Sequence, residues 1–339
     1  MKLRSIAHGI ATAMMVTVLA ACGGGSQQTE LAGDWDGIVA AAKDEGSLTL
    51  YTSAGTAPSE ALVRGFENKY GIDVTLVRGI DSELLPKVET ELGINRGIAD
   101  VFITSDQTWV ESHPEAVMNI EGPSVHDVAY AASENAPGGT WAATHAFVAA
   151  LSWNTDLVDT APTSAADLLS PELAGGRIGL PNPDTSPSIV QFYANMEKAQ
   201  GPDFLERLAA QKPRIYSSTA TVMQAIASGE IAISPYTQPM VDEKAAGAPV
   251  DYVIPEDAWG ASSFGGVLTT APNPNAGQLF LDYLLSREGQ SAFTAPKYAT
   301  PRTDVDGAAA AFEQITLTDG YPEQDKVADF RARFKSLMF

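Results

Sequence analysis

The sequence has a single cysteine among its 339 residues, and only 21 basic side chains stand against 42 acidic ones. One cysteine excludes an intrachain disulfide and any site built from several thiolates. The formal net charge of −21 repels phosphate backbones, so we expect no nucleic-acid partner. Hydrophobic residues still make up 45% of the chain, which is ample for globular cores, and the length predicts two domains.

Motifs of the common enzyme classes are missing as well. After the first 22 residues, histidine occurs only at His113, His126 and His145, none of them with the spacing of a metal site. The sequence contains neither a Gly-x-x-x-x-Gly-Lys phosphate loop nor a Gly-x-Gly-x-x-Gly turn. We therefore expect a protein that is not an enzyme, with no catalytic residues, no metal and no cofactor.

A secreted serine hydrolase is the alternative from another functional class. Residues 261–265, Ala-Ser-Ser-Phe-Gly, loosely imitate a nucleophile elbow around Ser263. The first glycine of that motif is missing, and the segment is expected to lie inside a strand rather than at a strand-to-helix turn. The motif therefore gives this alternative little support.

The first 22 residues have the features of an export signal. Lys2 and Arg4 precede an apolar run over residues 6–20, which is shorter than a membrane-spanning helix requires. The run ends in Leu-Ala-Ala-Cys, which resembles the lipobox of bacterial lipoproteins. This resemblance implies that residues 1–21 form a signal peptide and that Cys22 carries the lipid. Residues 22–33, with Gly-Gly-Gly-Ser after the cysteine, then form a flexible tether, and the protein is extracytoplasmic and anchored to the cell membrane.

Beyond the tether, strand-like and helix-like segments alternate. Runs typical of strands at 47–51, 73–77 and 99–104 are separated by segments whose apolar residues recur at helical spacing. This order predicts an α/β fold with a parallel sheet that is covered by helices on both faces. Thr56 is expected to cap the helix that follows the first strand, because Pro58 stands in its first turn.

Two long apolar segments, 144–153 and 261–270, are each long enough to pass from one domain into another. They predict two α/β lobes joined by two crossing strands that form a hinge. The expected boundaries are 34–142 with 264–307 for the N-lobe, and 143–263 with 308–339 for the C-lobe.

Several short segments occur in an order that resembles one protein family. They are GSLTLYTS at 46–53, FENKYGIDV at 66–74, WNTD at 153–156, LLSPEL at 168–173 with GRI at 176–178, GEIAI at 229–233, PNPN at 272–275 and LSREGQ at 285–290. The family is that of ABC-transporter solute-binding proteins, in the group that binds ferric iron, thiamine, polyamines and phosphonates. The resemblance implies the type II periplasmic-binding-protein fold, a monomer that closes on a small-molecule solute between its lobes, and a cognate ABC permease as partner.

Hydroxyl side chains are frequent where the expected strands lead into the cleft between the lobes. Together with backbone N–H groups at helix starts they suit an oxyanion, such as a phosphonate, a sugar phosphate or a carboxylate. Serine and threonine also cap helices routinely, which is the alternative interpretation for each of them. Arg78 and Arg302 are further candidates for a contact with an anion. The expected ligand-binding residues are Ser53, Ala54, Thr56, Ser105, Asp184, Thr185, Ser186, Tyr216, Ser217, Tyr236 and Trp259.

Ferric iron is the alternative solute. The iron-binding branch of the resembled family carries a Tyr-Tyr pair just beyond the segment at 229–233, and ferric iron prefers anionic oxygen ligands. The corresponding positions in this sequence are Pro239 and Met240. An iron site would therefore need a non-standard ligand set, drawn from Tyr51, Tyr193, Tyr216 and Tyr236.

Overall fold

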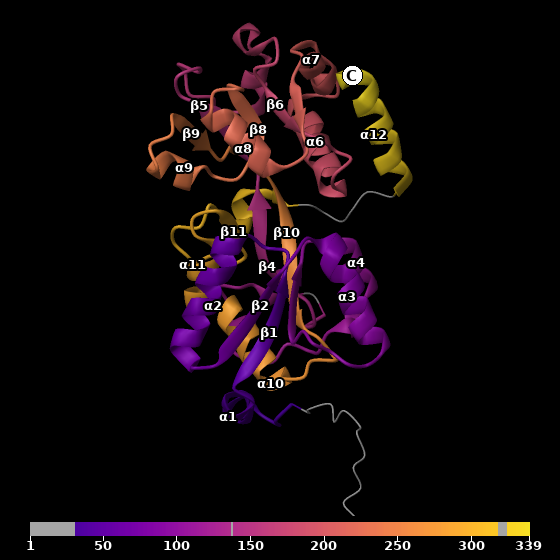
Figure 1. Ribbon diagram of the computed structural model, residues 1–339, viewed down its shortest axis with the longest axis vertical. Helices are drawn as coiled ribbons and strands as arrows, with labels where there is room; N and C mark the ends of the chain where they lie inside the picture. Colours follow the sequence, from indigo (N-terminus) through magenta and orange to yellow (C-terminus); the bar gives the residue numbers. More distant parts are fainter. Residues whose placement is uncertain (1–30, 137, 318–323) are drawn as a thin grey trace, which may run out of the picture.

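The structure, a computed structural model, describes residues 31–136, 138–317 and 324–339. These residues form two α/β lobes that lie one above the other in Figure 1. The predicted signal peptide, Cys22 and most of the predicted tether lie outside the described residues. In the part of the chain that is described, no helix is long and apolar enough to cross a membrane.

The larger lobe is built on an eight-stranded sheet, in which seven strands follow the order β12-β11-β4-β10-β3-β1-β2 and β13 lies beside β10. The strands are β1 (Ser47–Thr52), β2 (Asp73–Arg78), β3 (Val101–Thr104), β4 (Ala142–Val148), β10 (Trp259–Val267), β11 (Tyr298–Thr300), β12 (Ala310–Ala311) and β13 (Thr316–Leu317). The expected parallel pairing is found for β1 with β2 and β3. The middle of the sheet is antiparallel, because β10 enters it from the other lobe and runs opposite to its neighbours β3 and β4.

Amphipathic helices cover this sheet. They are α1 (Trp35–Glu45), α2 (Thr56–Tyr70), α3 (Asp81–Gly93), α4 (Gln107–Ser112), α5 (Ala132–Asn135), α10 (Pro274–Leu285) and α11 (Arg287–Thr294), with 3-10 turns at Pro114–Ala116 and Ser124–His126. On one face, Phe66 of α2 packs edge-to-face on Phe280 of α10, with their ring centroids 5.0 Å apart. On the other face, Leu84 and Val88 of α3 are fully buried with Phe102 of β3. Burial on both faces explains why β3, Val-Phe-Ile-Thr, is almost entirely apolar.

The smaller lobe contains a three-stranded antiparallel sheet, β8-β5-β9, and a parallel pair, β6 and β7. The strands are β5 (Ala150–Asn154), β6 (Gly179–Pro181), β7 (Arg214–Tyr216), β8 (Ile233–Thr237) and β9 (Val250–Val253). A parallel bridge between Ile178 and Ile233 places β6 next to β8. The helices are α6 (Pro187–Gln200), α7 (Phe204–Ala210), α8 (Thr219–Ala227), α9 (Val241–Ala245) and α12 (Gln324–Met338), with 3-10 turns at Ala165–Leu169 and Pro171–Leu173.

The lobes are joined where β4 continues into β5 and where β10 returns, as Figure 1 shows. The expected single crossing strand at 144–153 is thus two strands with Ala149 between them. The C-terminal part of the chain also contacts both lobes. Its strands β12 and β13, with a 3-10 turn at Phe312–Gln314 between them, pair with strands of the larger sheet. Its last helix, α12, packs on α6 and α7 of the smaller lobe. The lobe boundaries given above stay a prediction.

Candidate functional site

The carboxyl ends of strands from both lobes face the connection between the lobes. In the larger sheet, Thr104 at the end of β3 lies opposite Phe264, and Val148 at the end of β4 lies opposite Gly260, near the start of β10. In the smaller sheet, Thr237 at the end of β8 lies opposite Ala150, directly after β4. The loops after these strands therefore face the connection between the lobes. We call them the junction loops: 53–55, 79–80 and 105–106 in the larger lobe, and 182–186, 217–218 and 238–240 in the smaller lobe.

The first junction loop connects β1 to α2. Ser53 is half-buried, its backbone N–H donates to the Ile103 carbonyl, and Ala54 is buried. The expected cap of α2 by Thr56 is wrong. Gly55 is the residue before the helix, no side chain caps it, and Thr56 is the exposed first helical residue. The Gly55 N–H instead donates to the Tyr298 hydroxyl over 2.8 Å.

A carboxylate organises the next junction loop. The hydroxyls of Thr104 and Ser105, at the end of β3, donate to the two carboxylate oxygens of Asp81 at the start of α3, at 2.8 Å and 2.5 Å. The Ser105 hydroxyl hydrogen is therefore used by Asp81 and cannot at the same time be donated to a solute.

The junction loop before α6 holds three of the expected residues, Asp184, Thr185 and Ser186. Thr185 is exposed and donates to the Asn182 carbonyl, and the exposed Asp184 carboxylate lies 3.8 Å from Arg331 of α12. Ser186 is the N-cap of α6, where its Oγ accepts from the Ser188 N–H and also lies 2.7 Å from the Ser188 hydroxyl. Ser186 is thus both a helix cap and part of a hydroxyl pair.

Tyr236 and Trp259 come together behind that hydroxyl pair. Their rings stack with centroids 6.3 Å apart, and Phe192 packs on both. Tyr236 is 8% exposed and Trp259 is 3% exposed. Burial raises the pKa of the Tyr236 hydroxyl well above its usual value, and a side-chain hydrogen bond from Ser188 opposes that rise. A cavity of about 30 Å³ beside Trp259 has room for little more than a water molecule.

Tyr216 and Ser217 lie at the end of β7. The Tyr216 hydroxyl donates to Glu230 over 2.9 Å, and its pKa is raised by burial and by this hydrogen bond. Ser217 is exposed. The neighbouring Ser218 caps α8 by accepting from the Thr221 N–H. Tyr216 therefore contacts its own lobe, and Ser217 is the free hydroxyl residue of this junction loop.

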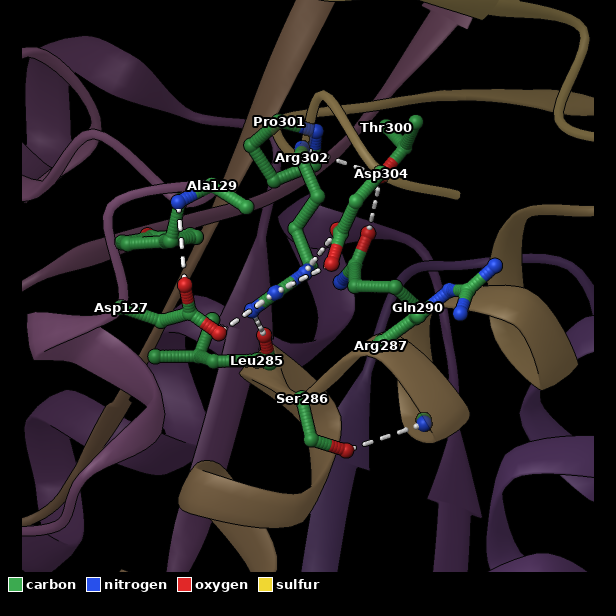
Figure 2. Close-up of polar contacts among 12 residues, drawn as sticks. Asp127, Ala129, Leu285, Ser286, Arg287, Gln290, Thr300, Pro301, Arg302 and Asp304 are labelled. Atoms are coloured by element: carbon green, nitrogen blue, oxygen red, sulfur yellow. Dashed lines mark hydrogen bonds and ion pairs between the residues drawn. The ribbon is translucent and has the colours of Figure 1, made fainter. Parts of the chain in front are cut away.

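The two arginine candidates differ. Figure 2 shows Arg302 saturated by partners of its own lobe: its guanidinium pairs with Asp127 at 2.7 Å and with Asp304 at 2.7 Å and 2.9 Å, and donates to the Leu285 carbonyl. Arg302 is 2% exposed, so it is a structural residue. Arg78 is exposed at the end of β2, and its Nε donates to the Ala54 carbonyl of the first junction loop over 2.6 Å.

The tyrosines proposed as iron ligands are spread over the molecule. Tyr51 donates to Glu91, and burial together with that carboxylate raises its pKa to about 12. Tyr193 donates to the Pro181 carbonyl and is fully buried. In the described residues, no group of three or more His, Cys, Asp or Glu side chains could hold a metal ion.

Comparison with known proteins places this architecture in a family. The family model described as bacterial extracellular solute-binding protein matches residues 48–296. The chain belongs to this family. It is thus a solute-binding component of an ABC transporter, as the sequence predicted, and members of the family are extracytoplasmic binding proteins.

Individual relatives agree with this assignment. The Fe(3+)-binding periplasmic protein of Serratia marcescens is 28% identical over 275 residues, which cover 75% of this chain and 78% of that protein. The substrate-binding protein of an ABC transporter from Agrobacterium tumefaciens superimposes with a TM-score of 0.70 at 17% identity, over 88% of this chain and 96% of that one. AfuA from Actinobacillus pleuropneumoniae, with exogenous fructose-6-phosphate bound, gives a TM-score of 0.60 at 22% identity, over 86% and 97%. The structural matches establish the shared two-lobe fold, which confirms the predicted fold class.

The sequence missed one residue of the junction, Tyr298. It could not have been found, because its partner Gly55 lies 243 residues away in the sequence and no motif surrounds it.

Proposed function

We propose that this solute-binding protein is a monomer anchored through a lipid on Cys22 and that it delivers a small oxyanion-bearing organic solute to its ABC permease. The solute would be a phosphonate, a sugar phosphate or a carboxylate, bound between the junction loops of the two lobes. The observation that carries this proposal is the hydroxyl pair of Ser186 and Ser188 at the start of α6.

The start of α6 suits the oxygen atoms of an anion. Ser186 and Ser188 have two hydroxyl hydrogens and share one hydrogen bond, so one hydrogen is left to donate to Tyr236 or to a solute. The pair sits at the N-terminus of a helix of 14 residues, where the helix dipole is positive. Ser53, Thr56 and Ser217, on the facing and neighbouring loops, add further donors.

Ferric iron is the second candidate solute, because the Serratia marcescens relative is named as an Fe(3+)-binding protein. The contacts of this chain argue against it. A phenol binds ferric iron as its anion, and the hydroxyls of Tyr51 and Tyr216 donate to carboxylates that hold them in the neutral form. Tyr193 and Tyr236 are buried, which also raises their pKa.

The geometry around Ser263 gives no support to a hydrolase. Ser263 and His145 lie opposite each other on β10 and β4, but no hydrogen bond joins their side chains in the described structure. Both are buried, and burial lowers the pKa of His145 to about 3, which makes it a poor general base at neutral pH. We propose that the protein performs no reaction, and Ser263→Ala should leave solute binding unchanged.

A thermal-shift panel tests the solute class. It would contain 2-aminoethylphosphonate, fructose 6-phosphate, citrate, ferric citrate and putrescine. A ligand at about 100 times its dissociation constant stabilises the protein by about 2.7 kcal/mol, which is a visible shift. A shift with ferric citrate that citrate alone does not produce would favour the iron alternative.

Removal of hydroxyls from both sides of the junction tests the position of the site. The double variant Ser53→Ala with Ser186→Ala should bind the solute at least about tenfold more weakly, or about 1.4 kcal/mol. Ser286→Ala is the matched control, because Ser286 caps α11 by the same kind of hydrogen bond but does not belong to a junction loop. Unchanged affinity in the double variant would overturn the proposed site.

A further inference from the structure

Arg78 is a cationic residue beside the junction loops that is held by a backbone carbonyl and has no carboxylate partner among the described residues. Its Nε donates to the Ala54 carbonyl over 2.6 Å, and its Nη1 and Nη2 form neither a hydrogen bond nor an ion pair with any other described residue. By contrast, Asp81 accepts two hydroxyls, Asp184 faces Arg331, and Lys297 pairs with Asp242. Lys297 and Arg331 thus have carboxylate partners, whereas the positive charge of Arg78 has none among the described residues.

The backbone places this guanidinium beside the first junction loop. Arg78 is the last residue of β2 and lies in register with Thr52, the last residue of β1. The next residue, Gly79, donates its N–H to the Thr52 carbonyl, so the end of β2 is fixed against the loop that carries Ser53. The bond from Nε to Ala54 then fixes the side chain over the same loop, although Arg78 is exposed to solvent.

An arginine held through Nε keeps its two Nη groups free as a pair of parallel donors. That pair matches the two oxygens of a carboxylate or phosphate group, which a lysine cannot do. We infer that Arg78 is the residue of the larger lobe that selects an anionic solute, by a two-point contact from Nη1 and Nη2 to its carboxylate, phosphonate or phosphate group. This inference rests on the proposed function, and it adds the charged group that the hydroxyl-lined loops lack.

The backbone N–H of Gly55, at the start of α2, does not serve this purpose. It donates to the Tyr298 hydroxyl at 2.8 Å, and Tyr298 is 5% exposed. The start of α2 is thus occupied by a tyrosine hydroxyl, and the positive charge beside this loop comes from Arg78.

The test compares three variants of the full chain by titration calorimetry. Arg78→Gln removes the charge and the fork, and Arg78→Lys keeps the charge without the fork. Arg64→Gln is the matched control, because Arg64 is exposed on α2 of the same lobe and, among the described residues, pairs only with the exposed Glu60, at 3.6 Å. The probes are 2-aminoethylphosphonate, fructose 6-phosphate and citrate, with fructose as the neutral analogue of the second.

We expect Arg78→Gln to bind the tightest oxyanion probe about tenfold more weakly, or weaker still, because a hydrogen bond to a charged group contributes that much to affinity. Arg78→Lys should recover only part of the loss, and Arg64→Gln should stay within about twofold of the parent, since it removes the same charge from a site screened by solvent. The melting temperature of the ligand-free variants should not change, because Arg78 is exposed.

The outcomes separate the inference from the proposed function. If the parent binds an oxyanion probe and Arg78→Gln binds it equally well, Arg78 is not the selecting residue, although the proposed solute class stands. If Arg78→Gln fails to fold, the Arg78→Lys variant decides, and parental affinity there overturns the two-point contact. If the parent binds ferric citrate or putrescine and none of the oxyanions, the proposed function and this inference fall together.

Discussion

Acidification should destabilise this protein through one buried imidazole, that of His145. The ring is 3% exposed on crossing strand β4 and lies between Tyr298 and Phe293, with ring centroids 4.4 Å and 4.8 Å away. Its Nδ1 lies 3.0 Å from the Thr144 hydroxyl. Burial lowers its pKa to about 3 from the ordinary value of 6.5, because no carboxylate compensates the charged form.

The size of the effect follows from that difference in pKa. Above pH 6.5 the imidazole is neutral in both states, so it contributes no pH dependence. As the pH falls below 6.5 the unfolded chain takes up a proton that the folded protein excludes, and the free energy of unfolding falls by about 1.4 kcal/mol per pH unit. At pH 5 the loss is about 2 kcal/mol. This value depends on the unfolded pKa alone, since the folded pKa lies well below 5.

Urea unfolding followed by tryptophan fluorescence at about pH 7.5 and pH 5 measures this loss. Other groups titrate in the same range: burial raises the pKa of Asp100 to about 6, which stabilises the protein as the pH falls. The contribution of these groups cancels when the parent is compared with His145→Gln. Between pH 7.5 and pH 5, the free energy of unfolding of His145→Gln should fall by about 2 kcal/mol less than that of the parent. His126→Gln is the control, because it makes the same substitution at an exposed histidine. An identical pH dependence in the parent and in His145→Gln would refute the reasoning.

Three further predictions concern contacts around the junction and the larger lobe. Arg302→Met should lower the free energy of unfolding by about 3 kcal/mol at neutral pH, since it leaves two carboxylates and a buried carbonyl without their partner. These carboxylates have lowered pKa values, so the loss of stability measured by urea unfolding should become smaller as the pH falls below their ordinary pKa of 3.8. Tyr298→Phe leaves the Gly55 N–H without its acceptor and should cost about 1 kcal/mol in the same assay, with Gly55→Ala more harmful because its Cβ would lie 2.9 Å from the Tyr298 hydroxyl. Lys297→Met removes the ion pair to Asp242 of α9 and should weaken solute binding by no more than about fivefold. Both groups are partly exposed, so calorimetry at high salt should show a smaller difference between this variant and the parent.

The alternation of strands and helices was predictable because the pattern is local. The predicted strands at 47–51 and 73–77 are β1 (Ser47–Thr52) and β2 (Asp73–Arg78), within a residue at each end. The two crossing segments were also visible, because a strand that is buried along its whole length needs an unbroken apolar run. The break at Ala149 and the antiparallel entry of β10 were not visible, since both are set by the partner strands.

The contacts that decide the site were less predictable. A serine that follows a strand was a candidate for capping and for binding alike, and the sequence could not say to which acceptor its hydroxyl donates. Arg302 and Arg78 looked equivalent, but one meets Asp127 across 175 residues of sequence whereas the other meets a nearby carbonyl. Such partners depend on tertiary packing, for which the pattern of a single chain holds no signal.

The two sides of the junction contribute to binding at different ranges. Hydroxyls, such as those of Ser186 and Ser188, act only at contact, because a dipole interaction decays steeply with distance. A guanidinium acts over about 8 Å at physiological salt. With the proposed roles, a solute would therefore be drawn first to the larger lobe by Arg78, and the hydroxyls of the smaller lobe would contribute once the lobes approach. Loss of Arg78 would then slow association as well as weaken binding, whereas loss of Ser186 would raise the dissociation rate alone.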